Sequence, residues 1–315
     1  MATIAYLGPP GTFSEEALLS EADLAEHELV DLPTFPDVLA AVAGGRTDLG
    51  FVAVENAIEG TVNVTVDALV FEHDLLIQRE VVLPIHQHLL APAGLALDQV
   101  EHVVSFPVAL AKCRRFFGER LSGAREVAAP STSDAARMVA AGECPPRSAA
   151  IGTRLAAKLY DLEVLTDSIE DHPENATRFV LVARPEAGLP APTGHDRTSI
   201  VLFQRHNAPG SLHAILGEFA ARGLDLTKLE SRPRKQALGQ YCFLIDVVGH
   251  IADEVVADCL RQVHASLAEV KLLGCYPAAG EGSDARRAEA PQAFRDAAAW
   301  VEAWRQRIRP GPRQP

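Results

Sequence analysis

The stretch "NATRFVLVAR", residues 175–184, joins a polar start to a strand-forming interior. Its run of β-branched and aromatic residues, Phe179–Val182, predicts a buried strand. Thr177 can donate or accept a hydrogen bond, and Arg178 can pair with a carboxylate through two hydrogen bonds. A strand start with an ordinary Arg ion pair explains the same residues. We expect this strand to close an α/β region and to return to its first half.

Two similar runs of alternating strands and helices precede this strand, a pattern typical of α/β proteins. We expect a catalytic domain over 1–184. Its first lobe would span about 1–80 and 170–184, and its second lobe about 81–169. Two such lobes leave a cleft between them, and small-molecule sites usually lie in clefts of this kind. The alternation over Leu75–Pro92 predicts one long strand.

The remainder of the chain predicts a separate module. Residues 185–196 are rich in Pro and Gly and predict a linker. Residues 197–277 follow a βαββαβ order, which is typical of a ferredoxin-like module. Residues 278–315 read as a polar linker and an amphipathic helix that carries Trp300 and Trp304.

The bulk composition excludes several classes of function. The chain has 315 residues and a net charge of −13, which argues against nucleic-acid binding and requires any anion site to be built locally. The five Cys, with no C-x-x-C spacing, indicate reduced thiols and a cytoplasmic protein. We expect neither a signal peptide nor a membrane span, because no apolar run reaches about 18 residues.

Hydroxyls and an amide stand at the ends of predicted elements. Thr12, Ser131 and Thr132 lie at helix starts, where hydroxyls and free N–H groups can hold a carboxylate. Simple N-capping explains them equally well. Glu55 and Asn56 end a strand, on the side from which α/β sheets bind ligands. An Asn turn is the alternative for that pair.

Other polar residues are weaker candidates. His86 and His88 share one face of the predicted strand, but no further metal ligand follows at a convincing spacing. We therefore expect no metal and no cofactor. The basic run within Glu230–Lys235 reads first as a solvated face.

Several motifs in this order resemble the prephenate dehydratase family: "YLGPPGTFS", "VENAIEGTV", "STSDAA", "AAIGTRLAAKLYDL" and "NATRFVLV". The later "NAPGSLHAIL" and "ESRPRKQALGQYCFLIDVVGH" resemble the regulatory ACT domain of that family. The resemblance covers about residues 3–277 and implies a monofunctional enzyme. It implies a periplasmic-binding-protein-like catalytic region and a ferredoxin-like ACT domain.

The resemblance also implies the reaction and its residues. The family converts prephenate to phenylpyruvate in phenylalanine biosynthesis, without a cofactor, because formation of the aromatic ring drives the reaction. The resemblance makes Thr177, Arg178 and Phe179 the catalytic group. It implies a substrate-binding set of Thr12, Glu55, Asn56, Ser105, Ser131 and Thr132.

The regulatory resemblance implies feedback by L-phenylalanine and a homodimer or homotetramer. Its implied effector residues are Asn207, Pro209, Gly210, Ser211, Leu212, Glu230, Ser231, Arg232 and Pro233. This chain departs from the family in two places. Phe106 and Val108 replace a His and a Gln of a family motif, while Ser105 and Cys113 remain. Ser211 replaces an Ala in the usual Gly-Ala-Leu.

Two alternatives share this pattern. An arogenate dehydratase performs the same chemistry on the amino form of the substrate. A catalytically silent two-lobed protein could report an amino acid through the ACT module.

Overall fold

The computed structural model describes residues 1–205, 208–235, 239–280 and 290–307. The chain forms two compact units. The first unit contains Met1–Leu75 and Glu80–Ala187, and the second contains Leu76–Arg79 and Gly188–Pro315. The first unit holds two sheets, and the second holds one.

The first lobe of the first unit is built on a sheet with the strand order β2-β1-β3-β11-β5, and β4 pairs with β3. Because β11 lies beside β3, the stretch that closes the α/β region belongs to the N-terminal sheet. The strands are β1 (Thr3–Leu7), β2 (Glu28–Leu32), β3 (Leu49–Asn56), β4 (Gly60–Thr61), β5 (Leu76–Pro84) and β11 (Ala176–Ala183). The first four residues of β5 group with the second unit. The helices are α1 (Phe13–Leu19), α2 (Ala22–Ala25), α3 (Phe35–Ala43) and α4 (Asn63–Asp67), the last continued by a π-helical turn at Ala68–Glu72.

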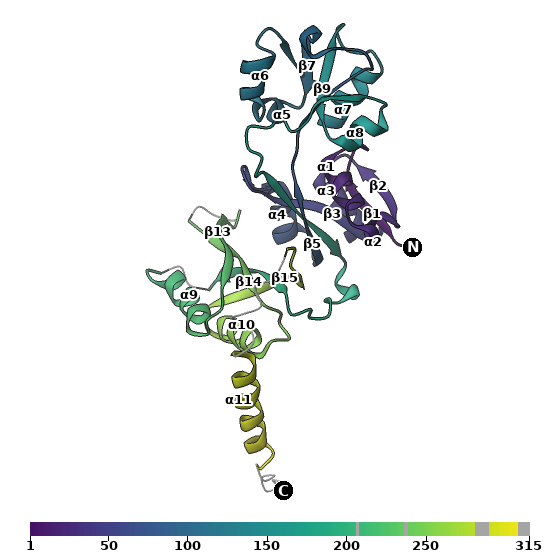
Figure 1. Ribbon diagram of the computed structural model, residues 1–315. Helices are drawn as coiled ribbons and strands as arrows, with labels where there is room; N and C mark the ends of the chain where they lie inside the picture. Colours follow the sequence, from purple (N-terminus) through teal and green to yellow (C-terminus); the bar gives the residue numbers. More distant parts are fainter. Residues whose placement is uncertain (206–207, 236–238, 281–289, 308–315) are drawn as a thin grey trace. The chain divides into compact units, whose positions relative to one another are not determined.

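The second lobe has the strand order β10-β6-β9-β7-β8. Figure 1 shows β7 and β9 beside the helices α5, α6, α7 and α8. The strands are β6 (His88–Ala91), β7 (His102–Ser105), β8 (Arg125–Ala128), β9 (Ser148–Gly152) and β10 (Glu163–Thr166). The helices are α5 (Pro107–Ala111), α6 (Arg114–Arg120), α7 (Thr132–Ala140) and α8 (Arg154–Leu159), with a 3-10 turn at Leu97–Gln99.

The single strand predicted over Leu75–Pro92 is wrong, because β5 ends at Pro84 and β6 begins at His88 in the other sheet. Proline has no N–H to give to a sheet neighbour, which favours a strand end. The next residues bond instead to a segment far along the chain. The N–H of Ile85 donates to the Asn175 carbonyl at 2.8 Å. Alternation continues across the break, so periodicity alone does not reveal it.

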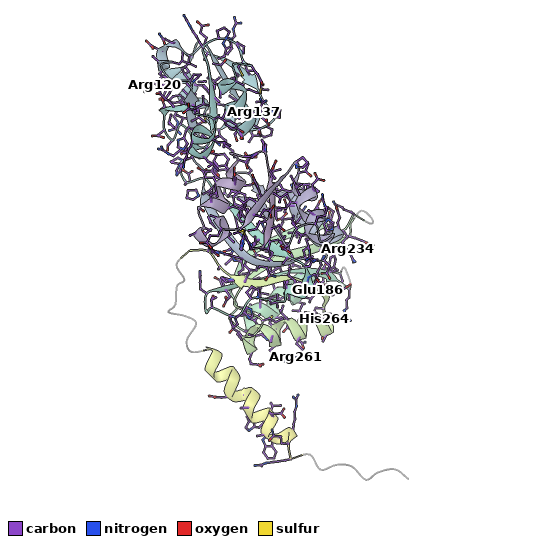
Figure 2. All side chains as sticks on the ribbon, turned by 90° about the vertical axis from the view of Figure 1, so that its right-hand side faces the viewer. Arg120, Arg137, Glu186, Arg234, Arg261 and His264 are labelled. Carbon is purple, nitrogen blue, oxygen red and sulfur yellow. The ribbon has the colours of Figure 1, made fainter. Side chains whose placement is uncertain are left out.

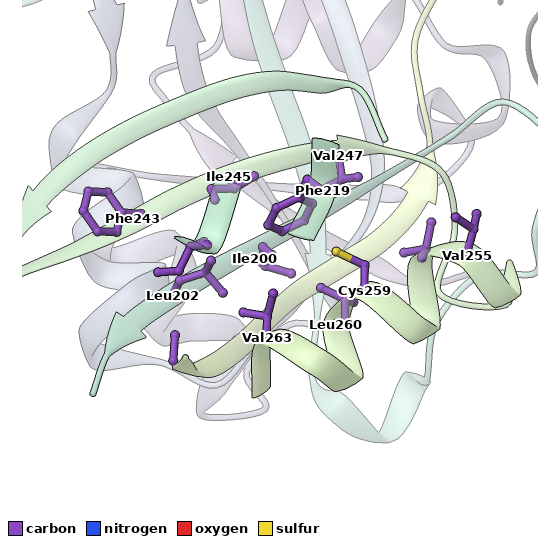
Figure 3. Packing of buried hydrophobic residues seen from close by; sticks show 13 residues of the cluster. Ile200, Leu202, Phe219, Phe243, Ile245, Val247, Val255, Cys259, Leu260 and Val263 are labelled. Carbon is purple, nitrogen blue, oxygen red and sulfur yellow. The ribbon is translucent and has the colours of Figure 1, made fainter. Parts of the chain in front are cut away.

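The second unit has the predicted βαββαβ order, and its sheet runs β13-β14-β12-β15. Figure 3 shows its core, where Phe219 of α9 and Cys259 and Val263 of α10 pack against side chains of the sheet such as Ile200 and Ile245. The elements are β12 (Asp196–Gln204), α9 (Ser211–Ala221), β13 (Leu226–Pro233), β14 (Tyr241–Val248), α10 (Glu254–Ser266), β15 (Ala268–Pro277) and α11 (Ala290–Arg305), preceded in the first unit by a 3-10 turn at Pro185–Ala187.

Charged side chains gather on the outside of both units. Figure 2 labels Arg120 and Arg137 of the first unit and Arg261 of the second, all of which are exposed. Arg137 pairs with Glu143 at 3.1 Å. Among the described residues, no helix combines the length and the apolar character that crossing a lipid bilayer requires.

Gly50 tests the packing of β3. A Cβ built on Gly50 would lie 2.7 Å from Val42 Cγ2 and 3.1 Å from Val38 Cγ1, both on α3. We expect Gly50→Ala to lower the free energy of unfolding by about 1–3 kcal/mol through overpacking. The measurement is the unfolding transition in urea.

Gly118 provides a control for the same substitution. It lies inside α6, and no atom stands within 4 Å of its built Cβ. We expect Gly118→Ala to raise the free energy of unfolding, by about 0.5–1 kcal/mol, because Ala loses less backbone entropy in a helix. An equal effect at both glycines would contradict the packing explanation.

Candidate active site

The pairing of β3 with β11 brings two separately predicted motifs together. Thr177 lies opposite Asn56, and Phe179 lies opposite Ala53. The register shifts between Arg178 and Phe179, which marks a bulge in the ladder. An extra residue on one strand re-aims its side chains. As a result, Asn56 and Ala53, which are three apart, line the same pocket as Thr177 and Phe179.

The amide of Asn56 has a defined orientation. Its Oδ1 accepts the backbone N–H groups of Ile58 at 3.1 Å and Glu59 at 3.0 Å. Its Nδ2 must therefore face the other way, and it lies 2.9 Å from Thr177 Oγ1. Because an amide nitrogen only donates, the Thr177 oxygen is the acceptor of this bond. Within the described residues, no group accepts the Thr177 hydroxyl hydrogen, which is left for a ligand.

Thr177 faces a pocket of about 340 Å³. Residues of both lobes form its wall, which combines apolar side chains with hydroxyl and amide groups. Phe179 supplies one aromatic surface and stacks on Phe51, with ring centroids 5.1 Å apart. The wall consists of Leu7, Gly8, Thr12, Phe13, Ser14, Phe35, Ala53, Asn56, Ile85, Gln87, Phe106, Val108, Ala109, Lys112, Pro130, Ser131, Thr132, Thr177 and Phe179.

The three predicted helix-start hydroxyls reach this wall but differ in their bonding. Thr12 caps α1: its Oγ1 donates to the Leu7 carbonyl at 2.9 Å and accepts from Glu15 N at 3.5 Å. Ser131 caps α7 in the same way through Asp134. Thr132 has no hydrogen bond through its hydroxyl within the described ranges. Capping therefore accounts for Thr12 and Ser131, and Thr132 offers a hydroxyl to a ligand.

Three other predicted residues lie outside the wall. Arg178 lies between Thr177 and Phe179 and points to the opposite face of β11, as strand alternation requires. Its guanidinium lies 3.3 Å from Glu55 Oε2 and 3.0 Å from Glu80 Oε2. Ser105 is fully buried and donates to the Ile151 carbonyl at 3.0 Å. These contacts give Arg178, Glu55 and Ser105 structural partners away from the pocket.

Gln87 and Lys112 lie in the wall but are not among the predicted site residues. Gln87 is only 3% exposed, and its Oε1 has no hydrogen-bond partner in the structure. Lys112 is the ionisable side chain of the wall within the described residues. Gln87 stands between His86 and His88 in "LPIHQHLL", and Lys112 is the charged residue of the apolar run "PVALAKC". The run alone does not show which way either side chain points.

The remaining candidates for chemistry have other environments. Burial raises the pKa of the Cys113 thiol to about 12, so Cys113 is a neutral thiol at physiological pH. His86 Nδ1 lies 2.8 Å from Glu170 Oε1. Burial lowers the pKa of His88, which favours its neutral form. In the described part of the chain, no three metal-ligating side chains gather into a site.

The predicted effector motifs meet at one end of the second unit's sheet. Phe203, which leads into the turn before α9, pairs with Cys242, and Cys242 pairs with Arg232. Gly210 begins α9 with a φ of 86°, a value that favours glycine. Arg232 pairs with Glu230 at 2.7 Å.

The other predicted effector residues are distributed as follows. Leu212 packs against the core, Ser211 Oγ accepts from Gln204 Nε2 at 2.8 Å, Pro209 lies in the turn, Ser231 and Pro233 lie on β13, and Asn207 falls outside the described residues.

The chain matches two families and close relatives. The prephenate dehydratase family matches residues 4–187, and the ACT domain family matches residues 199–265. A prephenate dehydratase of Amycolatopsis methanolica is 41% identical and covers 96% of this chain and 98% of its own length. A structure described as GqqA, a novel type of quorum quenching acylase, is 32% identical, with a TM-score of 0.78 over 88% of this chain and 98% of its own.

The prephenate dehydratase of Arthrobacter aurescens, solved in complex with L-Phe, has a TM-score of 0.86 and 36% identity. It covers 96% of this chain and 99% of its own. The prephenate dehydratase match includes β3, β11 and the pocket described above, and the ACT match includes the βαββαβ unit up to α10. This chain therefore belongs to the prephenate dehydratase family and carries an ACT domain.

Proposed function

We propose that this chain converts prephenate to phenylpyruvate and is regulated by L-phenylalanine. One observation carries the proposal most strongly: Asn56 donates to Thr177 Oγ1 at 2.9 Å and leaves the Thr177 hydroxyl hydrogen available to a ligand in the pocket. The family match supplies the substrate.

The reaction breaks two bonds of the substrate ring. The C–C bond to the ring carboxylate breaks, CO2 leaves, and its electron pair enters the ring. The C–O bond at the opposite ring carbon breaks, and hydroxide leaves with that electron pair. Prephenate dianion thus yields phenylpyruvate anion, CO2 and hydroxide, which is protonated to water. No external oxidant or reductant is needed.

Thr177 assists the poor leaving group in this scheme. An ordinary hydroxyl is a very weak acid, so Thr177 acts as a hydrogen-bond donor to the departing oxygen. That bond strengthens as negative charge develops, which stabilises the transition state more than the ground state. Phe179 covers one face of the pocket, where the flat aromatic product can lie against it. Thr132 offers a second donor from the other lobe.

Rival activities fit the pocket less fully or need a separate assay. An arogenate dehydratase would use the same hydroxyl and is separated by assaying both substrates. An acylase needs a nucleophile beside a base, yet the described wall holds no His, Asp or Glu. A silent amino-acid sensor has no use for an oriented Thr177 hydroxyl. Release of phenylpyruvate by the purified protein distinguishes the enzyme from the last two.

The second unit is proposed as the L-phenylalanine site, because a family member of known structure was solved in complex with L-Phe. The proposal includes a homodimer or homotetramer. Trp300 and Trp304 on α11 are more than half exposed, and an assembly could cover them. The proposal also includes a cytoplasmic location, since all five Cys are free.

Replacing Thr177 tests the proposed donor directly. We expect Thr177→Val to lower kcat by about 100-fold or more, with a small change in KM, since the lost bond acts mainly in the transition state. Thr177→Ser keeps the hydroxyl and should retain most of the activity. A Thr177→Val variant with nearly normal kcat would refute the assigned role.

Asn56→Asp tests the direction of the hydrogen bond between Asn56 and Thr177, because the Asn and Asp side chains have almost the same shape. A carboxylate only accepts, so it would draw the Thr177 hydrogen away from the substrate. We expect a loss of kcat comparable to that of Thr177→Val, about 100-fold. The double variant should be little worse than either single variant, because both remove one interaction. Additive losses in steady-state kinetics would show that the two residues act separately.

Titration with L-phenylalanine tests the regulatory unit. We expect the rate of phenylpyruvate formation to fall as L-phenylalanine is added. Gly210→Ala should raise the concentration needed for half the effect, because its φ of 86° disfavours a Cβ. Gly217→Ala, on the open side of α9, is the matched control. If L-phenylalanine changed neither rate nor substrate affinity, the regulatory proposal would fail.

A further inference from the structure

The pocket of the first unit carries one formal charge on its described wall, the ammonium of Lys112. The other polar groups of the wall are neutral hydroxyls and amides. A dianion that enters the pocket loses part of its hydration, and a buried carboxylate is costly unless it is paired or hydrogen-bonded. Since Arg178 lies outside this wall, Lys112 is the described side chain able to supply a full opposite charge.

The backbone of Lys112 is hydrogen-bonded, and its ammonium forms a partly exposed ion pair. It is the C-cap of α5, and its carbonyl accepts the N–H of Asp171 at 2.7 Å. Its side chain is 19% exposed, and its Nζ lies 3.2 Å from Glu59 Oε1. Glu59 belongs to the turn after β3 in the first lobe, and its side chain is 49% exposed. Ion pairs of such exposure contribute little free energy, so a ligand can displace Glu59 at small cost.

The same turn contributes to the chemistry. The backbone N–H of Glu59 donates to Asn56 Oδ1, the bond that helps to orient Asn56 toward Thr177. Lys112 of the second lobe is therefore held beside the loop that positions the hydroxyl in the first lobe. A substrate bound to Thr177 lies within the same pocket that Lys112 lines.

We propose that Lys112 binds the retained carboxylate of the substrate, the one on its three-carbon side chain, and exchanges Glu59 for it. This inference rests on the proposed function. The other carboxylate leaves as neutral CO2, so a cation paired with it would stabilise the ground state and oppose the reaction. A cation helps only at the carboxylate that keeps its charge.

The same contact selects between the two substrate forms. The retained carboxylate of prephenate stands next to a keto group, whereas that of arogenate stands next to an ammonium group. Lys112 repels an ammonium at that position, and Glu59 attracts it. Lys112 therefore favours the keto acid, and removal of its charge leaves Glu59 to favour the amino acid.

Steady-state kinetics with both substrates test the proposal. We expect Lys112→Gln to raise KM for prephenate about tenfold or more, the worth of one charge-assisted hydrogen bond. Its kcat should change less than KM. The ratio of kcat/KM for arogenate to that for prephenate should rise. Lys112→Arg keeps the charge and should stay within a few-fold of the wild-type KM.

Glu59→Gln is expected to change KM for prephenate in the opposite direction from Lys112→Gln. It frees Lys112 and removes a competing carboxylate, so we expect KM for prephenate to fall by about threefold or more, less than the full worth of a charge-assisted bond. A damaged fold does not lower KM, so this result separates binding from stability. Arg114→Gln removes the same charge from an exposed position two residues away and should leave both substrates unaffected.

The outcomes distinguish this inference from the function on which it rests. A wild-type protein that releases no phenylpyruvate from prephenate defeats the proposed function itself. An active wild type whose Lys112→Gln variant keeps its KM and its substrate ratio overturns the inference alone. An effect of Arg114→Gln equal to that of Lys112→Gln also overturns it, because the global charge would then be the cause.

Discussion

The hydrogen bond from Asn56 to Thr177 is the interaction on which the proposed chemistry of this protein depends. A threonine hydroxyl is too weak an acid to be useful by reactivity alone, so its value depends on where its hydrogen points. Two backbone N–H groups hold the Asn56 carbonyl oxygen, the Asn56 nitrogen then holds the Thr177 oxygen, and the hydrogen remains available. The pairing of β3 with β11, including its bulge, brings these groups into register.

Local sequence patterns predicted the individual strands and turns of this site better than they predicted which side chains face the pocket together. The strand containing Thr177 and the turn at Asn56 were each recognisable, and the βαββαβ order of the second unit was confirmed. Strand alternation also implies that Arg178 faces away from Thr177 and Phe179. The Thr-Arg-Phe motif predicts that the three residues act together, but neighbouring residues of a strand point to opposite faces. Arg178 therefore forms its ion pairs with Glu55 and Glu80 on the other face.

The residues that were missed depend on long-range geometry. Gln87 falls within a region predicted as one strand, and its direction is defined only by the passage from one sheet to the other. Lys112 lies in a helix-forming run, where nothing local indicates which side meets the pocket. The net charge of −13 means that any anion site must be built locally, and Lys112 is the ionisable residue that the described wall offers for one.

The paired crossings between the two lobes have a mechanical consequence. Besides the bond from Ile85 to Asn175, the N–H of Ile169 donates to the Gln87 carbonyl at 2.8 Å, and Gln87 N–H donates to Glu170 at 2.9 Å. The two connecting segments, residues 85–87 and 169–175, are thus bonded to each other where the chain passes between the lobes, so a rotation of one lobe against the other would have its hinge there. Thr177 follows Asn175 by two residues. A turn of one lobe against the other at these segments would therefore act close to the Thr177 hydroxyl, and it would couple substrate access to the alignment of the proposed donor.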